Sequence, residues 1–211
     1  METLCTGSDT LRFARLWIAD PLRVAAVVPS GEVLARLITS ELGPDDGPVL
    51  ELGPGTGVFT RALIERGVAE DHLLLVERSA EFAELLRQRF PRAQLLHGDA
   101  ARLRPGEWAA TGLGGAVSGL PLLSMKPTQV LRILAAAFRH LRPGAGFYQF
   151  TYGPRCPVPR VVLERLQLSA QRIGGTWRNL PPASVYRIER LGSIGTSGYP
   201  GSYSEREDFY V

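Results

Sequence analysis

The feature that most constrains this chain is a glycine-rich turn placed directly after a short apolar run. Val49-Leu-Glu-Leu52 is typical of a buried strand, and Gly53-Pro-Gly-Thr-Gly57 then leads into a helical pattern over 57–66. Because glycines lack a side chain, the backbone can turn sharply there and a ligand can lie against it. A tight strand-to-helix connection alone also explains such a turn, so it indicates a ligand site only together with its neighbours.

Strand-like and helix-like segments alternate through much of the chain. Short apolar runs bounded by turn residues predict strands over 49–52, 73–76, 93–97, 115–118, 146–152 and 184–191. Helical patterns are found over 57–66, 80–90, 126–140 and 158–171. This alternation favours an α/β fold with a mostly parallel sheet and helices on both faces. Ligands of such sheets bind beyond the carboxyl ends of the strands, so functional residues are expected just after each strand.

The segments that flank this pattern differ in composition. Residues 8–40 are typical of amphipathic helices, interrupted at Pro21, with a second helix from Glu32 to about Leu42. A cluster of turn residues over 43–48 follows, and no apolar period is found beyond residue 191. We therefore expect an N-terminal helical lid or membrane-contact segment over 1–42, the α/β domain over 43–191, and a flexible or artificial tail over 192–211.

Composition limits the classes of protein to which this chain can belong. Its 211 residues suffice for one α/β domain with a full core, and a net charge of +3 does not by itself indicate nucleic acid. Cys5 and Cys156 have no metal-ligand spacing, so no metal is expected, and two reduced thiols fit a cytoplasmic protein. No signal peptide and no membrane-spanning run is visible. We expect a cytoplasmic monomer that contacts a membrane only from its surface.

Three acidic residues lie at the ends of successive predicted strands. Glu51 lies inside the end of the first, Glu77 ends the second, and Gly98-Asp99-Ala100 follows the third. From these places a carboxylate can meet the amino group of an amino-acid-like ligand, chelate a ribose diol, and accept a hydrogen bond from an adenine amine. A helix cap also explains Glu77 taken alone. Together with the glycine turn, the three acids have the positions expected for binding a nucleoside that carries an amino acid.

These residues resemble the class I S-adenosylmethionine-dependent methyltransferases. Val49–Gly57, Val76-Glu77 and Gly98–Ala100 are similar to the first three cofactor motifs of that family, in order, and the resemblance covers roughly residues 29–190. It implies a Rossmann-like fold with a seven-stranded sheet, S-adenosyl-L-methionine as cofactor and S-adenosyl-L-homocysteine as product. The cofactor-binding residues that it implies are Ser30, Glu51, Gly53, Gly55, Thr56, Gly57, Glu77, Arg78, Gly98, Asp99, Ala100 and Ser118. An NAD-linked dehydrogenase is disfavoured, because the glycine spacing is not that of a dinucleotide loop.

The segment after the fourth predicted strand, Ser118-Gly-Leu-Pro-Leu-Leu-Ser124, concerns the methyl acceptor. Methyltransferases of exocyclic base amines carry a motif such as Asn-Leu-Pro-Tyr there, whose amide holds the amine and whose ring stacks on the flipped base. This chain keeps Leu120-Pro121 but lacks the amide and the ring, which disfavours an RNA adenine as substrate. With residues 13–20 and 27–30, the segment is similar to the bacterial phospholipid N-methyltransferases, of the soluble phosphatidylethanolamine type.

That resemblance implies stepwise transfer of three methyl groups to phosphatidylethanolamine, through its mono- and dimethyl forms, giving phosphatidylcholine. The expected place is the inner face of the cytoplasmic membrane, and no nucleic acid is expected as partner. The expected substrate and membrane residues are Arg12, Phe13, Arg15, Leu16, Trp17, Leu120, Pro121, Leu122 and Arg155. The N-terminal ones have the composition of an interfacial helix that favours anionic lipids, although the same stripe can instead pack on the sheet. Arg155 is suited to a lipid phosphate or to solvent.

Methyl transfer from a sulfonium requires alignment and an unprotonated amine. We expect Tyr148, Gln149 and the carbonyl of Ser118 to hold the amine, and an aromatic face such as that of Tyr148 attracts a methylated ammonium. His97 and Tyr152 are the other titratable candidates, and Tyr148 also fits a core aromatic residue of the fifth strand. The alternative functions are an RNA adenine N6-dimethyltransferase and a non-catalytic S-adenosylmethionine-binding protein of the membrane surface.

Replacing Phe13 and Trp17 together by alanine tests the interfacial interpretation of the N-terminal segment. We expect the double variant to sediment less with anionic vesicles, because its apolar contact area is lost, while its affinity for S-adenosylmethionine is unchanged. Vesicle sedimentation and cofactor titration measure the two quantities on the same preparation. Sedimentation equal to that of the wild type would show that the stripe does not contact the membrane.

Overall fold

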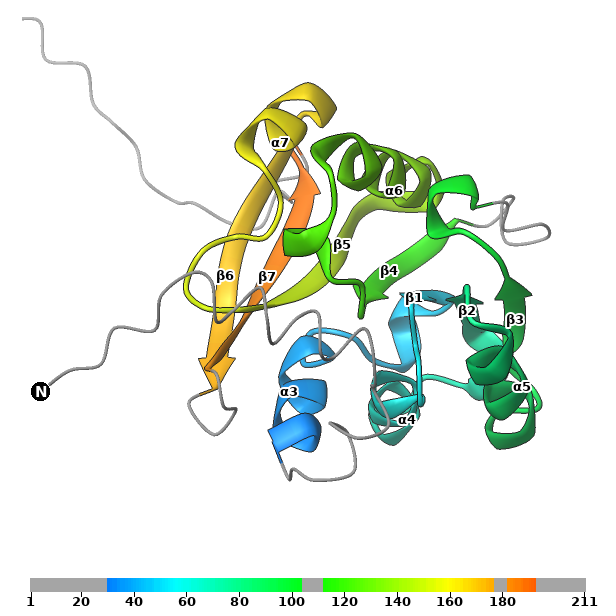
Figure 1. The fold of residues 1–211 in the computed structure, drawn as a ribbon. Helices are drawn as coiled ribbons and strands as arrows, with labels where there is room; N and C mark the ends of the chain where they lie inside the picture. Colours follow the sequence, from blue (N-terminus) through cyan, green and yellow to red (C-terminus); the bar gives the residue numbers. More distant parts are fainter. Residues whose placement is uncertain (1–29, 104–111, 177–181, 193–211) are drawn as a thin grey trace, which may run out of the picture.

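The structure is a computed structural model that describes residues 30–103, 112–176 and 182–192 (Figure 1). Its strands are β1 (Val49–Leu52), β2 (Leu73–Glu77), β3 (Gln94–His97), β4 (Leu113–Ser118), β5 (Leu141–Tyr152), β6 (Leu168–Thr176) and β7 (Ala183–Arg190). Its α-helices are α3 (Ser30–Ile38), α4 (Val58–Glu65), α5 (Ala80–Arg89), α6 (Pro127–His140) and α7 (Arg160–Leu166). Short 3-10 turns are η1 (Pro44–Asp46), η2 (Glu70–His72), η3 (Ala100–Arg102) and η5 (Leu122–Ser124).

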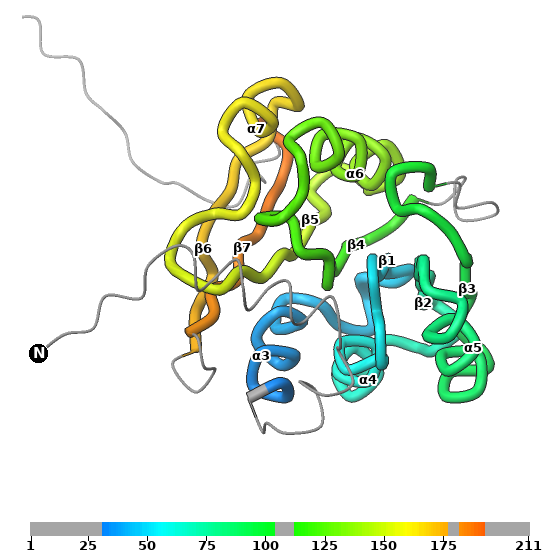
Figure 2. Tube along the Cα trace, in the orientation of Figure 1, coloured from blue at the N-terminus to red at the C-terminus, as the bar shows by residue number. Residues whose placement is uncertain are grey.

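All seven strands form one sheet in the order β3-β2-β1-β4-β5-β7-β6. Strands β1 to β5 are parallel to one another, whereas β7 runs antiparallel to both β5 and β6. The tube in Figure 2 shows β6 and β7 at the edge of the sheet opposite to β3. The carboxyl ends of the five parallel strands therefore meet along one edge, where the loops can gather around a ligand.

Helices cover both faces of this sheet, and each face has its own apolar core. Helices α3, α4 and α5 lie on one face, and α6 and α7 lie on the other (Figure 1). Alternate residues of β1 point into the two cores: Val49 packs with the α3–α5 side and Leu50 with the α6 side. Every residue of β1, β2 and β4 is buried, as expected for strands covered on both faces. The predicted Rossmann-like α/β fold with seven strands is confirmed.

One predicted element is wrong. The helix expected over 158–171 ends at Leu166, and Gln167 then adopts a left-handed conformation with a φ of 53°. Strand β6 begins at Leu168 and includes the end of the predicted helix. It is an edge strand whose central residues are half-buried or exposed and whose end contains Gly174 and Gly175, so no clean alternation marks it as a strand.

Other predictions concern parts of the chain that lie outside the described residues. The interfacial helix that contains Arg12, Phe13, Arg15, Leu16 and Trp17 is among them, as are residues 193–211 of the expected tail. Helix α3 begins at Ser30, two residues before the predicted start of the second helix. The division into segments 1–42, 43–191 and 192–211 stays a prediction.

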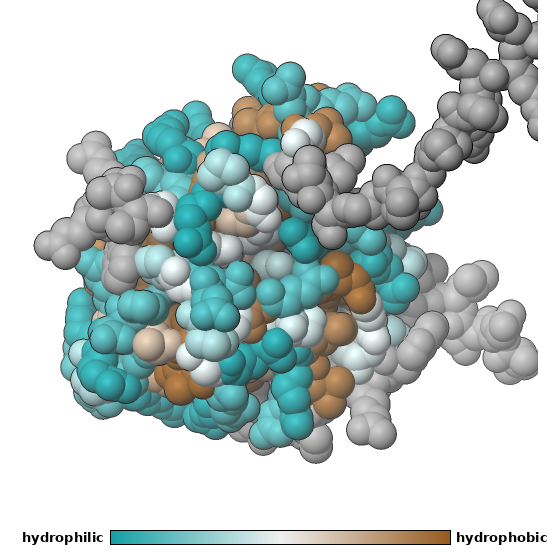
Figure 3. All heavy atoms as spheres, turned by 180° about the vertical axis from the view of Figure 1, so that it is seen from behind, coloured by the Kyte–Doolittle hydropathy of each residue, from teal (hydrophilic) through white to brown (hydrophobic). Residues whose placement is uncertain are grey.

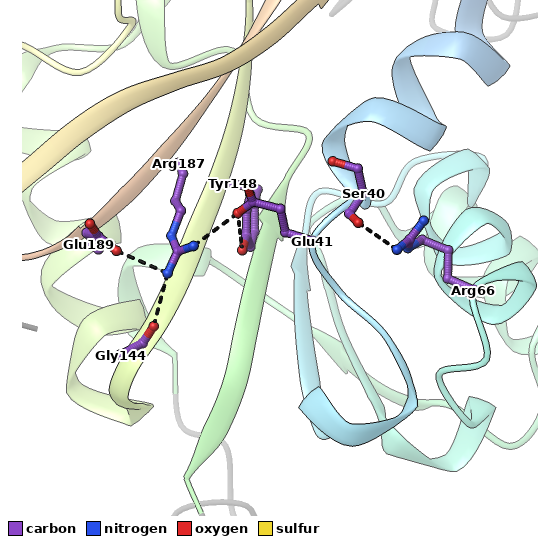
Figure 4. A network of polar contacts seen from close by, with 7 residues as sticks. All are labelled: Ser40, Glu41, Arg66, Gly144, Tyr148, Arg187 and Glu189. Carbon is purple, nitrogen blue, oxygen red and sulfur yellow. Dashed lines mark hydrogen bonds and ion pairs between the residues drawn. The ribbon is translucent and has the colours of Figure 1, made fainter. Parts of the chain in front are cut away.

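A polar network fixes the end of α3 against the sheet (Figure 4). The Tyr148 hydroxyl on β5 donates a hydrogen bond to Glu41 Oε2 at 3.0 Å, and Arg187 on β7 contacts the same oxygen at 3.2 Å. Arg187 also forms an ion pair with Glu189 at 3.1 Å and donates to the Gly144 carbonyl. One carboxylate thus joins the segment after α3 to two neighbouring strands.

The described surface carries few large apolar side chains. Leu123, Val161 and Leu191 are the exposed ones among the described residues. Figure 3 shows the face opposite to that of Figure 1, which is mainly hydrophilic with small separate apolar areas. In the same part of the chain, no helix has the length and apolar character that crossing a membrane requires.

Replacing Gly114 by alanine tests the packing of β4 against η1. A methyl group there would overlap the backbone carbonyl of Asp46, which cannot withdraw as a flexible side chain can. We expect the free energy of unfolding to fall by about 3 kcal/mol, the upper end of the usual cost of overpacking. Urea denaturation measures it, with Gly31→Ala as control because no described residue lies within 4 Å of the added methyl. Equal stability of the two variants would contradict this packing.

Candidate active site

The glycine turn after β1 has the backbone conformation that its sequence predicts. Gly53, Gly55 and Gly57 all have positive φ, at 66°, 54° and 82°. An added Cβ at Gly53 would lie 2.8 Å from Leu120 Cδ2, and one at Gly57 would overlap the Phe90 ring, so both positions are also closed by packing. An added Cβ at Gly55 would meet no atom of the described residues within 4 Å. The turn therefore leaves room for a ligand at its middle glycine.

Glu77, at the end of β2, holds this turn in place. Its Oε2 accepts a hydrogen bond from the Gly55 N–H at 3.1 Å, and its Oε1 accepts one from the Ser79 N–H at 2.8 Å. The carboxylate is 7% exposed, and it lies between the glycine turn and the start of α5. This is the place from which the resemblance implies that it holds a ribose diol. The capping alternative does not hold, because the N-cap of α5 is Ser79, whose hydroxyl accepts a hydrogen bond from the Phe82 N–H.

Glu51 is a fully buried carboxyl group with one unused oxygen. Thr60 on α4 donates a hydrogen bond to its Oε2 at 2.6 Å, whereas its Oε1 has no partner among the described residues. Burial raises the pKa of Glu51 to about 8, against the opposing effect of the Thr60 hydrogen bonds and with a small addition from the Glu77 charge. An unpaired buried carboxyl oxygen two residues before the glycine turn fits the cationic amino group of S-adenosylmethionine.

The loop after β3 lies beside Glu77. The Gly98 N–H donates to the Glu77 carbonyl at 2.9 Å, and the space around an added Cβ at Gly98 is open. The Asp99 carboxylate accepts from the Ala101 N–H at 2.9 Å and so caps η3, while Ala100 is buried. His97 bonds the Arg78 carbonyl through Nε2 at 3.1 Å, and both side chains are exposed. The position of Asp99 is compatible with an adenine contact, and that role stays a prediction.

The acceptor side of the site is formed by the ends of β4 and β5. Ser118 and Gln149 are paired in the register of these strands, and both side chains are fully buried. Gln149 Nε2 donates to the Leu120 carbonyl at 3.0 Å and to the Phe150 carbonyl at 2.8 Å, while Ser118 Oγ accepts from the Leu120 N–H. An adjoining pocket is lined by Leu120, Pro121, Leu122, Leu123, Phe150, Thr151, Tyr152 and Pro157.

Tyr148 does not join Ser118 and Gln149, which corrects the expected catalytic set. Neighbouring residues of a strand point to opposite faces, and Tyr148 packs in the α3–α5 core with its hydroxyl on Glu41. Its pKa is raised well above the ordinary 10, mainly by burial and then by the Glu41 charge. The hydroxyl therefore does not lose its proton at neutral pH, and the core interpretation of Tyr148 fits the structure.

Several site residues were missed in the sequence. Thr60 is the hydrogen-bond partner of Glu51, and Phe150, Thr151 and Pro157 line the acceptor pocket. A threonine inside a predicted helix gives no sign that its hydroxyl faces a buried acid. Of the other predicted substrate residues, Leu120, Pro121 and Leu122 line the pocket, and Arg155 is exposed in the loop after β5.

Comparison with known proteins agrees with this geometry. Residues 49–144 match a family described as a methyltransferase domain. The ornithine lipid N-methyltransferase of Singulisphaera acidiphila is 28% identical over 172 residues, which are 77% of this chain and 86% of that protein. Ribosomal RNA small subunit methyltransferase A of Anaeromyxobacter dehalogenans is 31% identical over 199 residues, 83% of this chain and 65% of that protein. The same enzyme of Synechococcus sp. (strain JA-2-3B'a(2-13)) is 40% identical over 95 residues, and the match spans 31% of its length.

Solved structures show the same fold. A TehB-like SAM-dependent methyltransferase from Corynebacterium glutamicum superposes with a TM-score of 0.58 at 19% identity, covering 88% of this chain and all of that one. The glycopeptide N-methyltransferase MtfA, complexed with S-adenosylmethionine, gives 0.56 at 17% identity, covering 76% and 94%. The chain has the Rossmann-like fold of these methyltransferases. MtfA has also been solved with S-adenosyl-L-homocysteine bound, with a TM-score of 0.50 at 19% identity.

Replacing Glu51 by glutamine tests the buried carboxyl. In the folded protein this group keeps its proton up to about pH 8, whereas in the unfolded chain it ionises near its ordinary pKa of 4.5. The wild-type free energy of unfolding therefore loses a contribution as the pH rises from about 4.5 to about 8, and the variant does not. We expect the melting temperature of the variant, relative to that of the wild type, to rise across this interval. Parallel profiles would contradict the raised pKa.

The same variant tests the cofactor contact. An ammonium beside Oε1 favours the carboxylate, so the wild type should release a proton when it binds S-adenosylmethionine at pH 7. Calorimetry in buffers of different ionisation enthalpy measures that proton. We expect Glu51→Gln to release none and to bind the cofactor more weakly, and proton release equal to that of the wild type would exclude this role of Glu51.

Proposed function

We propose that this protein transfers methyl groups from S-adenosylmethionine to the amine of phosphatidylethanolamine, in steps that lead to phosphatidylcholine at a membrane surface. The observation that carries the proposal is the acceptor pocket, which has no charged side chain among the described residues that line it. Such surroundings disfavour an ammonium and favour the neutral amine, because burial penalises the charged form. Only the neutral amine has the lone pair that attacks a methyl group.

The proposed step needs little chemistry from the protein. When bound, S-adenosylmethionine supplies a methyl group on a sulfonium, which is already activated toward a nucleophile. The lone pair of the amine forms the new N–C bond as the C–S bond breaks, and the electrons of that bond stay on sulfur. After the first and second transfers the resulting ammonium loses a proton to solvent, whereas the quaternary ammonium formed by the third has no proton to lose. The residues of this chain bind, align and exclude water, which is the contribution expected from a preorganised site.

Each part of the site has a distinct task in this proposal. The carboxyl of Glu51 and the carboxylate of Glu77 hold the amino group and the ribose of the cofactor. Gln149, with one amide oxygen unused, accepts a hydrogen bond from the amine. The apolar lining formed by Leu120 to Leu123 keeps water away from the reacting atoms.

The membrane-surface part of the proposal is supported by the loop after β5. Arg155 is exposed there, and it forms no ion pair within the part of the chain that the structure describes. A guanidinium in this place is suited to the phosphate of a lipid head group. Leu123, 45% exposed on the pocket lining, adds an apolar contact surface. The similarity to an ornithine lipid N-methyltransferase supports a lipid amine as acceptor.

Ribosomal RNA is the second candidate acceptor, because the relative from Anaeromyxobacter dehalogenans matches over 83% of this chain. The segment after β4 disfavours it. Ser118-Gly119 stands where an amide would hold the base amine, and Leu122 stands after Pro121 where a stacking ring would be.

Incubation with methyl-labelled cofactor separates these acceptors. Three parallel reactions contain phosphatidylethanolamine vesicles, ornithine lipid vesicles or small-subunit ribosomal RNA, each at the same acceptor concentration. We expect mono-, di- and trimethylated phosphatidylethanolamine on thin-layer chromatography. Label mainly in ornithine lipid would show that the acceptor is the amine of that lipid and not that of phosphatidylethanolamine. Label mainly in RNA would overturn the proposal.

Two neighbouring substitutions serve as matched variants in this assay. Gln149→Leu removes the amide on the acceptor side and should lower the rate by about a hundredfold, the lower range for a lost site hydrogen-bonding group. Tyr148→Phe removes a hydroxyl that bonds Glu41 on the opposite face, so its rate should stay within about twofold of the wild type. Equal losses in both variants would contradict the assignment of the two faces.

A further inference from the structure

Two buried oxygen atoms on one face of β5 have no hydrogen-bond partner. Gln149 and Thr151 are two residues apart on the strand, so their side chains leave it on the same side. Gln149 is 0% exposed and Thr151 is 3% exposed. Gln149 Oε1 and Thr151 Oγ1 both lack a partner among the described residues. Thr151 was not recognised in the sequence as a site residue.

The orientation of the Gln149 amide follows from its neighbours. Its Nε2 lies 3.0 Å from the Leu120 carbonyl oxygen and 2.8 Å from the Phe150 carbonyl oxygen. Both of those oxygens can only accept, so the amide nitrogen must face them and the amide oxygen must face elsewhere. The unused oxygen is therefore a fixed acceptor and not the result of a flipped side chain.

The Thr151 hydroxyl is not used by the adjoining strand. Its cross-strand neighbour on β7 is Ser184, whose hydroxyl accepts a hydrogen bond from Arg172 Nε at 3.2 Å. Thr151 lines the acceptor pocket together with Leu120 to Leu123. A hydroxyl that is buried without a partner costs stability, and such groups in folded proteins call for a specific explanation. A donor ligand in the pocket supplies one.

We propose that Gln149 Oε1 and Thr151 Oγ1 form a two-acceptor subsite for the two N–H groups of a neutral primary amine, and that this subsite favours the first methyl transfer over the later ones. The inference rests on the proposed function and deepens it. A neutral primary amine has two N–H groups and one lone pair. When both N–H groups are bound by fixed acceptors, the lone pair points in one direction, which is the alignment that the transfer requires.

Each completed transfer removes one donor from the substrate. A neutral monomethylamine has one N–H group left, and a neutral dimethylamine has none. The contribution of the two acceptors therefore falls from the first transfer to the third, and the third depends on shape and apolar contacts alone. Because both oxygens are covered in the structure, a neighbouring side chain of the pocket moves aside when the amine binds.

Thr151→Val tests the subsite, because valine keeps the shape of threonine and removes its hydroxyl. Wild type and variant are each given vesicles that contain phosphatidylethanolamine, its monomethyl form or its dimethyl form as the only amine, and initial rates of label transfer are measured. We expect the variant to lose about tenfold with phosphatidylethanolamine, as for one hydrogen bond in a site, and less than twofold with the dimethyl form. Thr151→Ser, which keeps the hydroxyl, should retain the wild-type order of rates.

Stability and cofactor binding provide an independent measurement. If Thr151 had only a structural role, its replacement would lower the melting temperature, whereas removal of an unpartnered buried hydroxyl should leave it equal or raise it. The affinity for S-adenosylmethionine should not change. A lower melting temperature, or equal losses with all three lipids, would overturn the subsite while leaving the proposed function intact. Failure of the wild type to label any of the three lipids would instead overturn the proposed function, and the lipid subsite with it.

Discussion

One recurring backbone hydrogen bond organises the functional edge of the sheet. In the loop after β1, the Gly53 N–H donates to the Val76 carbonyl of β2. In the loop after β3, the Gly98 N–H donates to the Glu77 carbonyl, and in the loop after β4, the Gly119 N–H donates to the Leu52 carbonyl. Each loop is therefore held by the strand next to its own. The carboxylate of Glu77 adds a side-chain bond to the Gly55 N–H within the same edge. Without these bonds, the acids and the acceptor pocket would have no common frame.

The alternation of side chains along β5 separates stability from chemistry. Tyr148 points to the face where Glu41 and Arg187 fix the end of α3, whereas Gln149 and Thr151 point to the opposite side. The Tyr148 hydroxyl is paired with Glu41, whereas Gln149 Oε1 and Thr151 Oγ1 have no partner among the described residues. A strand that is buried on both faces can place one residue in a packing contact and the next in the candidate site, because successive side chains point to opposite faces.

Much of the fold and of the cofactor side was predictable from the sequence. The buried parallel strands are short apolar runs, and the glycine turn and the acids at strand ends are local patterns. Strand β6 was not predictable, because an edge strand with two glycines is stabilised by its pairing with β7 and not by its own pattern. The sequence also did not indicate which of Tyr148 and Gln149 faces the candidate site. Alternation along a strand assigns the two residues to opposite faces without saying which face holds the site. The place of Thr60 depends on its contact with Glu51 on another element, and that of Thr151 on pocket residues such as Leu120 that are distant in sequence.

The strand order has a consequence for how such enzymes diversify. The residues assigned to the donor come from β1, β2, β3 and the loops after them, while the acceptor pocket comes from the segments after β4 and β5. Away from the contacts that cross the β1–β4 boundary, such as Gly53 with Leu120 and Gly119 with Leu52, mutations on one side can accumulate with little effect on the other. The residues for the methyl donor can then stay unchanged in evolution while those around the acceptor change. Relatives named for a lipid and for ribosomal RNA are what such a division of labour would leave behind.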